Sequence, residues 1–578
     1  MDIDIDIDID QDNAIAVATD TSGATDTSVA ADSGTAYDVV IAGAGPVGLL
    51  LGCELRLGGA RVLVVERLAE VDETIKAGSV NSPSAEALYR RGLLPALAEV
   101  QERAFSRFRE FRKERGDDEN APPPPRFAGH FAGIWLHGDL LDESDPAFAD
   151  LGPAEHVGFI PQAELERILA RHAEELGVEV RRQVELTGFE VEEGEDAEGA
   201  EGGHVTVQLT RATGGPTRTD GSPLTTGDSP LTETVTETVR TGWLVGCDGG
   251  RSVVRKLAGF DFPGTEPEIT GYQALVTMTG TEELRTGWHT TDVGTYAHGP
   301  MPGRILTVEF GGAPADREAP ITAVELEGSI RRVTGVDVTV TGVHSATRFT
   351  DNCRQASTYR KGRVLLAGDA AHVHSPFGGQ GLNLGLGDAM NLGWKLAAVV
   401  RGWAPKGLLD SYTAERHPIG AWVLDWTRAQ IALMRPETHA RALRKVITEL
   451  TGTITGTTFF AKKISGVWQR YDLAGEHPLV GRSAPDLELS DGSRLADHLR
   501  TGRALLLDLG DDPKLRARAE GYGDRVTVVT ADCAGRPELA GMLVRPDGFV
   551  AWAADAGRDD GEGLEEALER WLGVPVGA

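Results

Sequence analysis

Basic residues and long apolar runs are both scarce in this chain of 578 residues. Lys and Arg number 57 against 88 Asp and Glu, which gives a formal net charge of -31. A uniformly acidic surface repels a phosphate backbone, so DNA and RNA are excluded as partners. Hydrophobic residues make up 40% of the chain, but no run reaches membrane-spanning length. The composition therefore predicts a globular, multi-domain protein with no membrane partner.

Cysteine is also rare. The chain has four, at positions 53, 247, 353 and 533, with no CxxC and no paired-ligand spacing. Neither a disulfide scaffold nor a zinc site is indicated, and we expect a reducing cytoplasm. The start, MDIDIDIDIDQDNAIAVATDTSGATDTSVAADSG, lacks the basic region and apolar core of a secretory signal and predicts a disordered acidic tail.

What is abundant is glycine, and its first informative cluster follows a strand-like run. Residues 37–67, YDVVIAGAGPVGLLLGCELRLGGARVLVVER, predict a strand, a glycine turn, a helix and a second strand. Gly43, Gly45 and Gly48 form GxGxxG, and Glu66 ends the second strand. These glycines let backbone approach a pyrophosphate at a helix N-terminus, while the acid accepts hydrogen bonds from a ribose. The motif does not separate NAD from FAD.

Two later stretches do separate these cofactors. In GWLVGCDGGRSVVRKLAG a strand leads into Asp248, and in GRVLLAGDAAHVHSPFGGQGLNLG Asp369 ends a buried strand. A carboxylate there can accept the hydroxyls of a polyol chain, and Gly378, Gly379 and Gly381 let the next helix begin against a flat ring. A ribityl chain and an isoalloxazine fit these needs.

The start of that helix adds an electrostatic argument. Backbone N–H groups near Gly381, Leu382 and Asn383 would face the N1 and O2 edge of a flavin. The positive helix end would then favour the anionic reduced flavin.

The rest of the chain alternates in character. Between about residues 271 and 348, short alternating runs predict a mainly antiparallel sheet that could roof a pocket. Helical spacing follows from Gly381 to about Met434, with interruptions expected near Pro405 and Pro418. From about Pro478 strands and helices alternate again, which predicts a separate small α/β domain.

Together, GxGxxG, the Asp-Gly segment and Gly-Asp with PxGxxGxN resemble the single-component (group A) flavoprotein aromatic monooxygenases, the para-hydroxybenzoate and phenol hydroxylase superfamily. The resemblance covers nearly the whole chain from Tyr37. The last domain looks like the redox-inactive thioredoxin-like domain of phenol hydroxylase and of the aromatic polyketide hydroxylases of actinomycete antibiotic pathways. The absence of CxxC fits that inactive version.

The resemblance implies a mixed α/β (α+β) fold with three domains: a Rossmann-like FAD-binding domain, an inserted antiparallel-sheet substrate domain and a C-terminal thioredoxin-like domain. The expected division is a disordered tail over 1–35, an FAD-binding domain over 36–110, 151–190, 241–265 and 350–400, a substrate domain over 111–150, 191–240 and 266–349, a helical linker over 401–475, and the thioredoxin-like domain over 476–578.

The resemblance also implies particular FAD contacts. Asp369 would take a ribityl hydroxyl, Asp248 would lie between FAD and the nicotinamide approach, and Gln162 would lie on the ribityl or adenine side. Two positions depart from the family pattern: Lys76 stands at an arginine position, keeping the charge but losing the planar fork, and Pro83 replaces a second arginine. The full expected set is Gly43, Gly45, Pro46, Gly48, Glu66, Arg67, Lys76, Gln162, Asp248, Asp369, Pro376, Gly379, Gly381, Leu382 and Asn383.

Several residues have plainer interpretations. His372 and His374 could be a metal pair, but their i, i+2 spacing in a loop without a third ligand favours a structural or flavin-adjacent role, and no metal is expected. Asp248 could instead cap the helix that follows it. Glu415 and Arg416 could form a surface pair or pack beneath the flavin domain. Core positions are expected for Trp394, Trp403, Trp422 and Trp426.

With one dinucleotide fingerprint, a nicotinamide reductant would visit rather than reside. The resemblance implies that NAD(P)H, with NADPH expected, reduces FAD, that the reduced flavin adds O2 at carbon 4a, and that the hydroperoxide hydroxylates a polycyclic aromatic polyketide. A base could assist by removing the substrate's proton, but the catalytic residues are unknown: His137, His156 and Tyr272 have no spacing that singles one out.

Two alternatives remain open. One is Baeyer–Villiger insertion or oxidative ring rearrangement on the same scaffold, and the other is a flavin-binding scaffold protein without oxygenase turnover. The composition also leaves open whether the C-terminal domain supports a homodimer or buttresses the flavin domain.

Overall fold

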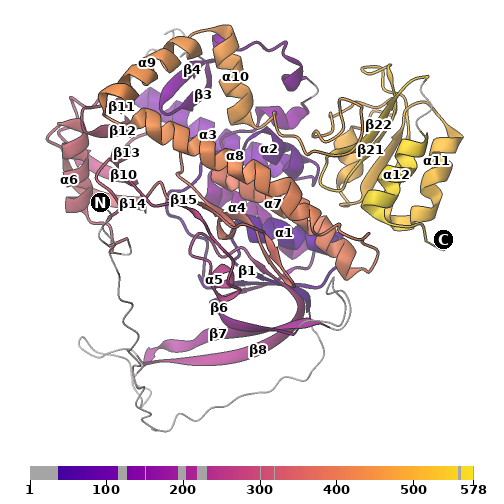
Figure 1. The fold of residues 1–578 in the computed structure, drawn as a ribbon. Coiled ribbons are helices and arrows are strands. Elements are labelled where there is room, and N and C mark those ends of the chain that lie inside the picture. Colours follow the sequence, from indigo (N-terminus) through magenta and orange to yellow (C-terminus); the bar gives the residue numbers. More distant parts are fainter. Residues whose placement is uncertain are drawn as a thin grey trace, which may run out of the picture.

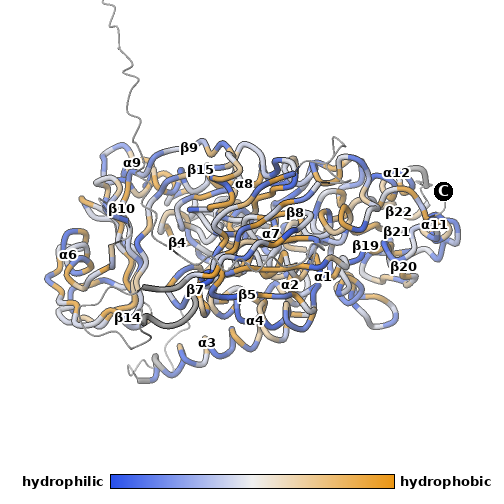
Figure 2. Tube along the Cα trace, turned by 90° about the horizontal axis from the view of Figure 1, so that it is seen from below, coloured by the Kyte–Doolittle hydropathy of each residue, from blue (hydrophilic) through white to orange (hydrophobic). Residues whose placement is uncertain are grey.

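The computed structural model describes residues 37–114, 126–149, 151–192, 203–217, 231–299, 301–314, 316–317, 319–557 and 561–576. The expected tail over residues 1–35 lies outside them. The described residues form three bodies in a row: an antiparallel sheet backed by a helix, a large mixed sheet covered by helices, and a small C-terminal domain (Figures 1 and 2). No helix in these ranges is long and apolar enough to cross a membrane.

The central sheet carries the glycine turn. Its two leading strands are runs of β-branched residues buried on both faces, as expected for parallel strands between helices. The strand order is β16 (Arg360–Lys361), β17 (Val364–Leu366), β8 (Leu231–Gly246), β1 (Tyr37–Ala42), β2 (Val62–Glu66) and β5 (Glu179–Arg182), and β6 (Val184–Glu192) and β7 (His204–Thr217) extend it through β8.

Strand β8 serves two parts of this sheet. Its first half pairs antiparallel with β7, and its end runs parallel between β1 and β17. The expected domain boundary between residues 240 and 241 falls inside this continuous strand.

Helices pack against the central sheet, and α1 lies between α4 and α7. They are α1 (Pro46–Leu57), α2 (Ser82–Tyr89), α3 (Leu94–Glu114), α4 (Gln162–Glu175), α5 (Val253–Leu257), α7 (Gln380–Val400) and α8 (Ser411–Met434). The break expected near Pro405 is confirmed, but the break expected at Pro418 is wrong. Pro418 lies inside α8, whose buried face holds the helix together across the missing N–H.

The second sheet is antiparallel, as the alternating runs predict. Its order is β11 (Gly287–Thr290), β12 (Gly294–His298), β13 (Arg304–Glu309), β10 (Thr270–Thr279) and β14 (Thr339–Phe349). Helix α6 (Ala323–Thr334) covers the outer face, where Tyr272, Ala274 and Val276 are buried. On the other face, Phe349 of β14 lies beside Phe377, and Gln273 and Leu275 of β10 are only half-buried.

Further elements precede the C-terminal domain. They are β3 (Phe127–Phe131), β4 (Ile134–His137), β9 (Gly264–Thr265), β15 (Cys353–Gln355), β18 (His372–Val373), α9 (Thr438–Thr451) and α10 (Ile454–Ser465), with 3-10 turns at Gly138–Leu140, Pro146–Phe148, Pro153–His156 and Gly368–Ala370.

The C-terminal domain is the small α/β unit that the sequence predicts. Its sheet has the order β20 (Val526–Thr530), β19 (Ala504–Asp508), β21 (Leu539–Val544) and β22 (Val550–Asp555), flanked by α11 (Pro513–Ala519) and α12 (Gly561–Leu572), with 3-10 turns at Leu495–Leu499 and Glu520–Arg525. Only β19 and β20 are parallel. Its single cysteine, Cys533, is buried.

A buried cluster of charges joins this domain to α7 and α8. Arg545 donates to both carboxylate oxygens of Glu415, at 2.9 and 2.8 Å, and also to Asp547. Lys395 lies 3.0 Å from Glu415 and 2.8 Å from the Asn391 amide oxygen. Burial of an unpaired charge is costly, so these groups hold the domains in one register.

The cluster predicts a defined acid sensitivity. Burial alone would raise the pKa of Glu415, but Arg545 and Lys395 lower it from 4.5 to about 2. The carboxylate therefore stabilises the fold fully above pH 4.5, and the contribution is lost as pH falls toward 2. We expect Glu415→Gln to lower stability by about 1–2 kcal/mol at pH 7 and to flatten the acid limb of the unfolding curve. Denaturant titrations between pH 2 and 7 check this, and an unchanged acid limb would contradict it.

Candidate functional site

The three motif glycines in the turn between β1 and α1 differ in how closely other atoms approach them. A Cβ on Gly43, whose φ is +103°, would lie 2.4 Å from the Cys247 carbonyl oxygen, and one on Gly48 would lie 1.9 Å from the Gly43 carbonyl oxygen. A Cβ on Gly45 would meet nothing within 4 Å. Gly45 is the N-cap of α1 and has no side-chain cap, so its turn leaves backbone N–H groups facing open space.

Glu66 fixes the shape of this turn. One carboxylate oxygen accepts from the Ala44 N–H at 2.9 Å and the other accepts from the Leu68 N–H at 2.9 Å. Each oxygen keeps a second lone pair for a ribose hydroxyl. Pro46 begins α1, and Arg67 is exposed beside Glu66.

Three segments meet at the start of α1. A Cβ on Gly368 would lie 3.1 Å from a Val47 methyl, and one on Gly385 would lie 2.6 Å from the same side chain. The structure therefore brings the glycine turn, the Gly-Asp loop and α7 together, as the motif order predicts. Asp369 is exposed in that loop and makes no hydrogen bond to any described residue.

A carboxylate that the sequence analysis missed clamps the Gly-Asp loop. Asp388 of α7 accepts from the Gly368 N–H at 3.0 Å, lies 2.6 Å from His372 Nε2, and accepts from Arg416 Nε at 2.8 Å. All of these side chains are buried. His372 is thus a structural residue, as its spacing favours, and Arg416 packs beneath the site rather than at the surface.

The N-terminus of α7 is shaped by two glycines in the left-handed region. Gly378 has φ +81° and Gly379, the N-cap, has φ +63°. Asn383 ties this turn to the neighbouring loop, donating to the Gly379 carbonyl at 2.8 Å and accepting from the Asn81 N–H at 2.8 Å. The first-turn N–H groups of α7, including those of Gly381 and Leu382, point out of a helix without a side-chain cap.

His374 supplies an acceptor beside that helix end. Its Nδ1 lies 2.7 Å from the Ser375 carbonyl oxygen, which can only accept, so Nδ1 carries the proton. Burial lowers the pKa of His374, which keeps the ring neutral. Its Nε2 is buried with no partner among the described residues, and a Cβ on Gly381 would lie 3.3 Å from it.

Asp248 lies at the end of β8 and does cap α5. Its Oδ2 accepts from the Val253 and Val254 N–H groups, at 2.6 and 3.2 Å. Its Oδ1 is buried with no partner in the described ranges. Arg255 of α5 donates to the Ala370 carbonyl at 2.9 Å, which connects this helix to the Gly-Asp loop.

The segment that contains Lys76 and Pro83, the two departures from the family pattern, packs beside α4. Lys76 forms an ion pair with Asp72 at 2.8 Å. The Gln162 N–H donates to the Ala77 carbonyl at 2.9 Å, so α4 supports this segment, while Pro83 lies in the first turn of α2. Pro376 is exposed at the start of the α7 turn.

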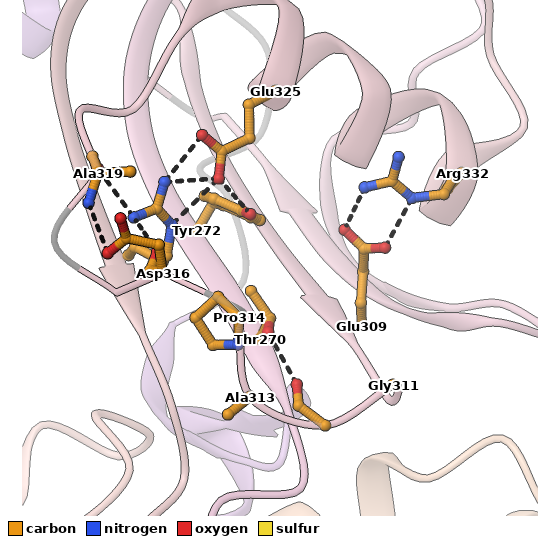
Figure 3. A pocket seen from close by; sticks show the side chains of 12 residues that line it. Thr270, Tyr272, Glu309, Gly311, Ala313, Pro314, Asp316, Ala319, Glu325 and Arg332 are labelled. Carbon is orange, nitrogen blue, oxygen red and sulfur yellow. Dashed lines mark hydrogen bonds and ion pairs between the residues drawn. The ribbon is translucent and has the colours of Figure 1, made fainter.

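None of the three candidate bases lies on the half-buried inner face. His137 and His156 are exposed. Tyr272 faces α6, where it donates to Glu325 at 2.7 Å, and burial and this bond raise its pKa to about 12. With Glu325 it lines an outer hollow of about 420 Å³, and Figure 3 shows both side chains there.

Aromatic residues fill the space between the Pro376–Gly379 turn and the second sheet. Phe377 lies 5.7 Å from Phe349 and 6.0 Å from Trp288, measured between ring centroids. Trp426 is buried beside Phe131, and Trp394 is buried against the C-terminal domain. The expected core positions are confirmed for Trp394 and Trp426, whereas Trp403 and Trp422 are only half-buried and pack against the edges of these clusters.

Comparisons with known proteins agree with this geometry. Residues 36–427 match the FAD binding domain family and residues 477–575 match the aromatic-ring hydroxylase C-terminal family. A 12-dehydrotetracycline 5-monooxygenase/anhydrotetracycline 6-monooxygenase of Streptomyces rimosus is 40% identical over 564 residues, covering 93% of this chain and 99% of the relative.

Solved structures give the same picture with one difference. An anhydrotetracycline hydroxylase from Streptomyces rimosus matches with a TM-score of 0.75 and 38% identity, covering 93% of this chain and 100% of that one. A Diels–Alderase from pyrroindomycin biosynthesis matches with a TM-score of 0.69 and 33% identity, covering 93% and 99%. The second match indicates that this fold is not restricted to one chemistry.

Proposed function

The chain belongs to the family of FAD-binding aromatic-ring hydroxylases, and on this premise we propose that it is an FAD-dependent monooxygenase that uses NAD(P)H and O2 to hydroxylate a polycyclic aromatic polyketide in antibiotic biosynthesis. The observation that carries the proposal is one convergence. The open Gly45 turn, the unpartnered Asp369 and the uncapped start of α7 are brought together by contacts around Val47.

The residues present fit FAD. The Gly45 turn, including Pro46 and Gly48, would take the pyrophosphate, and Glu66 would accept from the adenosine ribose. Asp369 would accept a ribityl hydroxyl. Buried polar atoms need partners, and the free acceptors at His374 Nε2 and Asp248 Oδ1 lie beside this region.

When bound, FAD supplies the redox chemistry, accepting a hydride from NAD(P)H and activating O2. The chain's part is positional and electrostatic. The first-turn N–H groups of α7 stabilise negative charge placed against them, and Asn383 holds that turn in place. The aromatic layer at Phe377 and the second sheet keep water away from the reacting atoms.

The proposed function is tested by oxygen uptake and NAD(P)H oxidation with a panel of polycyclic phenols and quinones. Substrate-stimulated oxidation with a product one oxygen heavier and an unchanged carbon skeleton supports hydroxylation. Insertion into a carbon–carbon bond would indicate Baeyer–Villiger chemistry instead. No stimulation by any aromatic would favour a flavin-binding protein without oxygenase turnover, an alternative that the Diels–Alderase relative keeps relevant.

Asp369 allows a direct test of FAD binding. Because it is exposed and makes no hydrogen bond within the described ranges, Asp369→Ala should leave the free energy of unfolding within about 0.5 kcal/mol of the parent value. Loss of a charge-assisted hydrogen bond should weaken FAD binding by about 10- to 100-fold. Titration of the apoprotein by visible absorbance measures this. Asp425→Ala, at an exposed position on α8, is the control, and equal affinity for FAD in both variants would contradict the assignment.

A further inference from the structure

The arginine side chains on the two faces of the second sheet differ in whether they are paired with a carboxylate. On the outer face every arginine of the hollow in Figure 3 is paired: Arg348 donates to Glu325 at 2.6 Å, and Arg332 donates to Glu309 at 2.7 Å. Both arginines of the hollow are therefore bound to carboxylates of the protein and are not available to a ligand. The arginine on the inner face is not paired in this way.

Strand register defines what lies on the inner face. Ile305 and Thr307 of β13 face α6, where Thr307 is hydrogen-bonded to Ser329. Leu306 and Val308 pack with the aromatic cluster on the opposite side. Because side chains alternate along a strand, Arg304 lies on the inner face with Leu306 and Val308.

Arg304 is half-buried on this face. Its guanidinium makes no hydrogen bond or ion pair with any described residue, and burial lowers its pKa. An arginine nevertheless stays charged at neutral pH. A cation that is partly withdrawn from water and has no counter-charge in the protein is stabilised by an anionic ligand group placed against it.

A second polar side chain lies diagonally opposite. Gln273 of β10 is half-buried on the same face, and its amide makes no hydrogen bond within the described part of the chain. Its register partner on β13 is Leu306, whereas Leu275 pairs with Arg304. Diagonal neighbours in an antiparallel sheet lie within reach of long side chains, so the two groups can act on one ligand edge.

The face is apolar at one end and cationic at the other. The Val308–Gly271–Phe349 row lies beside Phe377, which follows Pro376, and the Arg304–Leu275–Ser345 row lies four residues away. At the rise of a β-strand this separation is roughly 13 Å, about the length of three or four fused aromatic rings. A flat ligand on this face would have one end at the α7 turn and the other at Arg304.

We propose that Arg304, assisted by Gln273, is a specificity-determining site for an oxyanion, an ionised enol, phenol or carboxyl group, at the end of a fused-ring substrate remote from the ring that reacts. The inference rests on the proposed function for the location of the reacting ring. It adds a substrate class: polycycles that carry a negative charge at the far end. Arginine suits this role because its planar fork pairs with two oxygens at once.

The test uses two dihydroxyanthraquinones that differ in charge. Rhein carries a carboxylate where aloe-emodin carries a hydroxymethyl group. Binding of each to the FAD-loaded full-length protein is measured by calorimetry, for the parent and for Arg304→Met, Arg304→Lys and Gln273→Leu. Arg332→Met is the matched control because it removes a guanidinium from the outer side of the same sheet.

We expect the parent to bind rhein at least 10-fold more tightly than aloe-emodin. Arg304→Met should weaken rhein by about 10- to 100-fold and bring the two affinities within about 2-fold of each other. Arg304→Lys and Gln273→Leu should give intermediate ratios, and Arg332→Met should keep the parent ratio. Equal affinities in the parent, no affinity for either compound, or a ratio that survives Arg304→Met would each overturn the proposal.

NAD(P)H oxidation recorded in parallel separates this inference from the function on which it rests. Charge discrimination with no stimulated oxidation by these two compounds or by any aromatic of the panel would overturn the monooxygenase proposal and leave the Arg304 site standing. Stimulated oxidation with no discrimination in the parent would do the reverse. The parent measurement needs no variant, so a misfolded Arg304→Met protein does not leave the inference untested.

Discussion

Replacing Asp388 by alanine is expected to lower the free energy of unfolding by about 3–5 kcal/mol and to abolish stable FAD binding. The reason is that Asp388 is buried and accepts from or pairs with three groups: the Gly368 N–H, His372 and Arg416. Burial alone would raise the pKa of Asp388, but His372 and Arg416 lower it. Its removal leaves the buried Arg416 cation without its counter-charge and frees the loop that carries Asp369.

Asp388→Asn separates charge from shape. The amide keeps the volume and can still accept from Gly368, so its structural effect should be smaller than that of alanine, while the Arg416 charge is still left unpaired. Denaturant unfolding and FAD titration of both variants measure the two effects, and the circular dichroism of the parent and variants shows whether the fold persists. If Asp388→Ala had the same denaturant midpoint of unfolding as the parent, the contacts that Asp388 makes would not contribute to stability.

Motifs that act locally could be predicted from the sequence. The GxGxxG turn, the Gly-Asp loop and the start of α7 each depend on residues adjacent in the chain, and the structure places them at one edge of the central sheet. The roles of the individual glycines could not be separated in this way. Gly43 and Gly48 are required by backbone contacts to each other and to Cys247, and only the fold shows that Gly45 faces open space.

Contacts between distant elements escaped prediction. Asp388 meets His372 and Arg416 across 16 and 28 residues, and no periodicity links those positions. Adjacent residues of α8 also serve different partners: Glu415 binds Arg545 of the C-terminal domain, whereas Arg416 binds Asp388. A surface pair and a packing role were both compatible with the sequence, and burial decides for the packing role.

The helix through Pro418 and the inner face of the second sheet illustrate the same limit. Proline predicts a helix break from local chemistry alone, but tertiary packing of α8 overrides it. Likewise, the alternating runs between about residues 271 and 348 predict an antiparallel sheet, yet only the pairing of Leu275 with Arg304 shows which side chains share a face.

The glycine turn provides the second large effect, through two substitutions of identical size. Gly45→Ala and Gly48→Ala each add one methyl group three residues apart. At Gly48 the methyl would lie 1.9 Å from a backbone oxygen, so β1 and α1 must separate. We expect a loss of about 3 kcal/mol in unfolding free energy, with FAD binding lost as a consequence.

At Gly45 the added methyl meets no atom of the chain within 4 Å, and the backbone there is extended, so the unfolding free energy of the apoprotein should stay within about 0.5 kcal/mol of the parent value. The methyl would instead occupy the space that a pyrophosphate needs beside the α1 N-terminus, and FAD affinity should fall at least 10-fold. Apoprotein unfolding and FAD titration together separate the two variants. Parent-like FAD affinity in Gly45→Ala would contradict a pyrophosphate at this turn, because the one glycine that the fold does not require would then not be required by the ligand either.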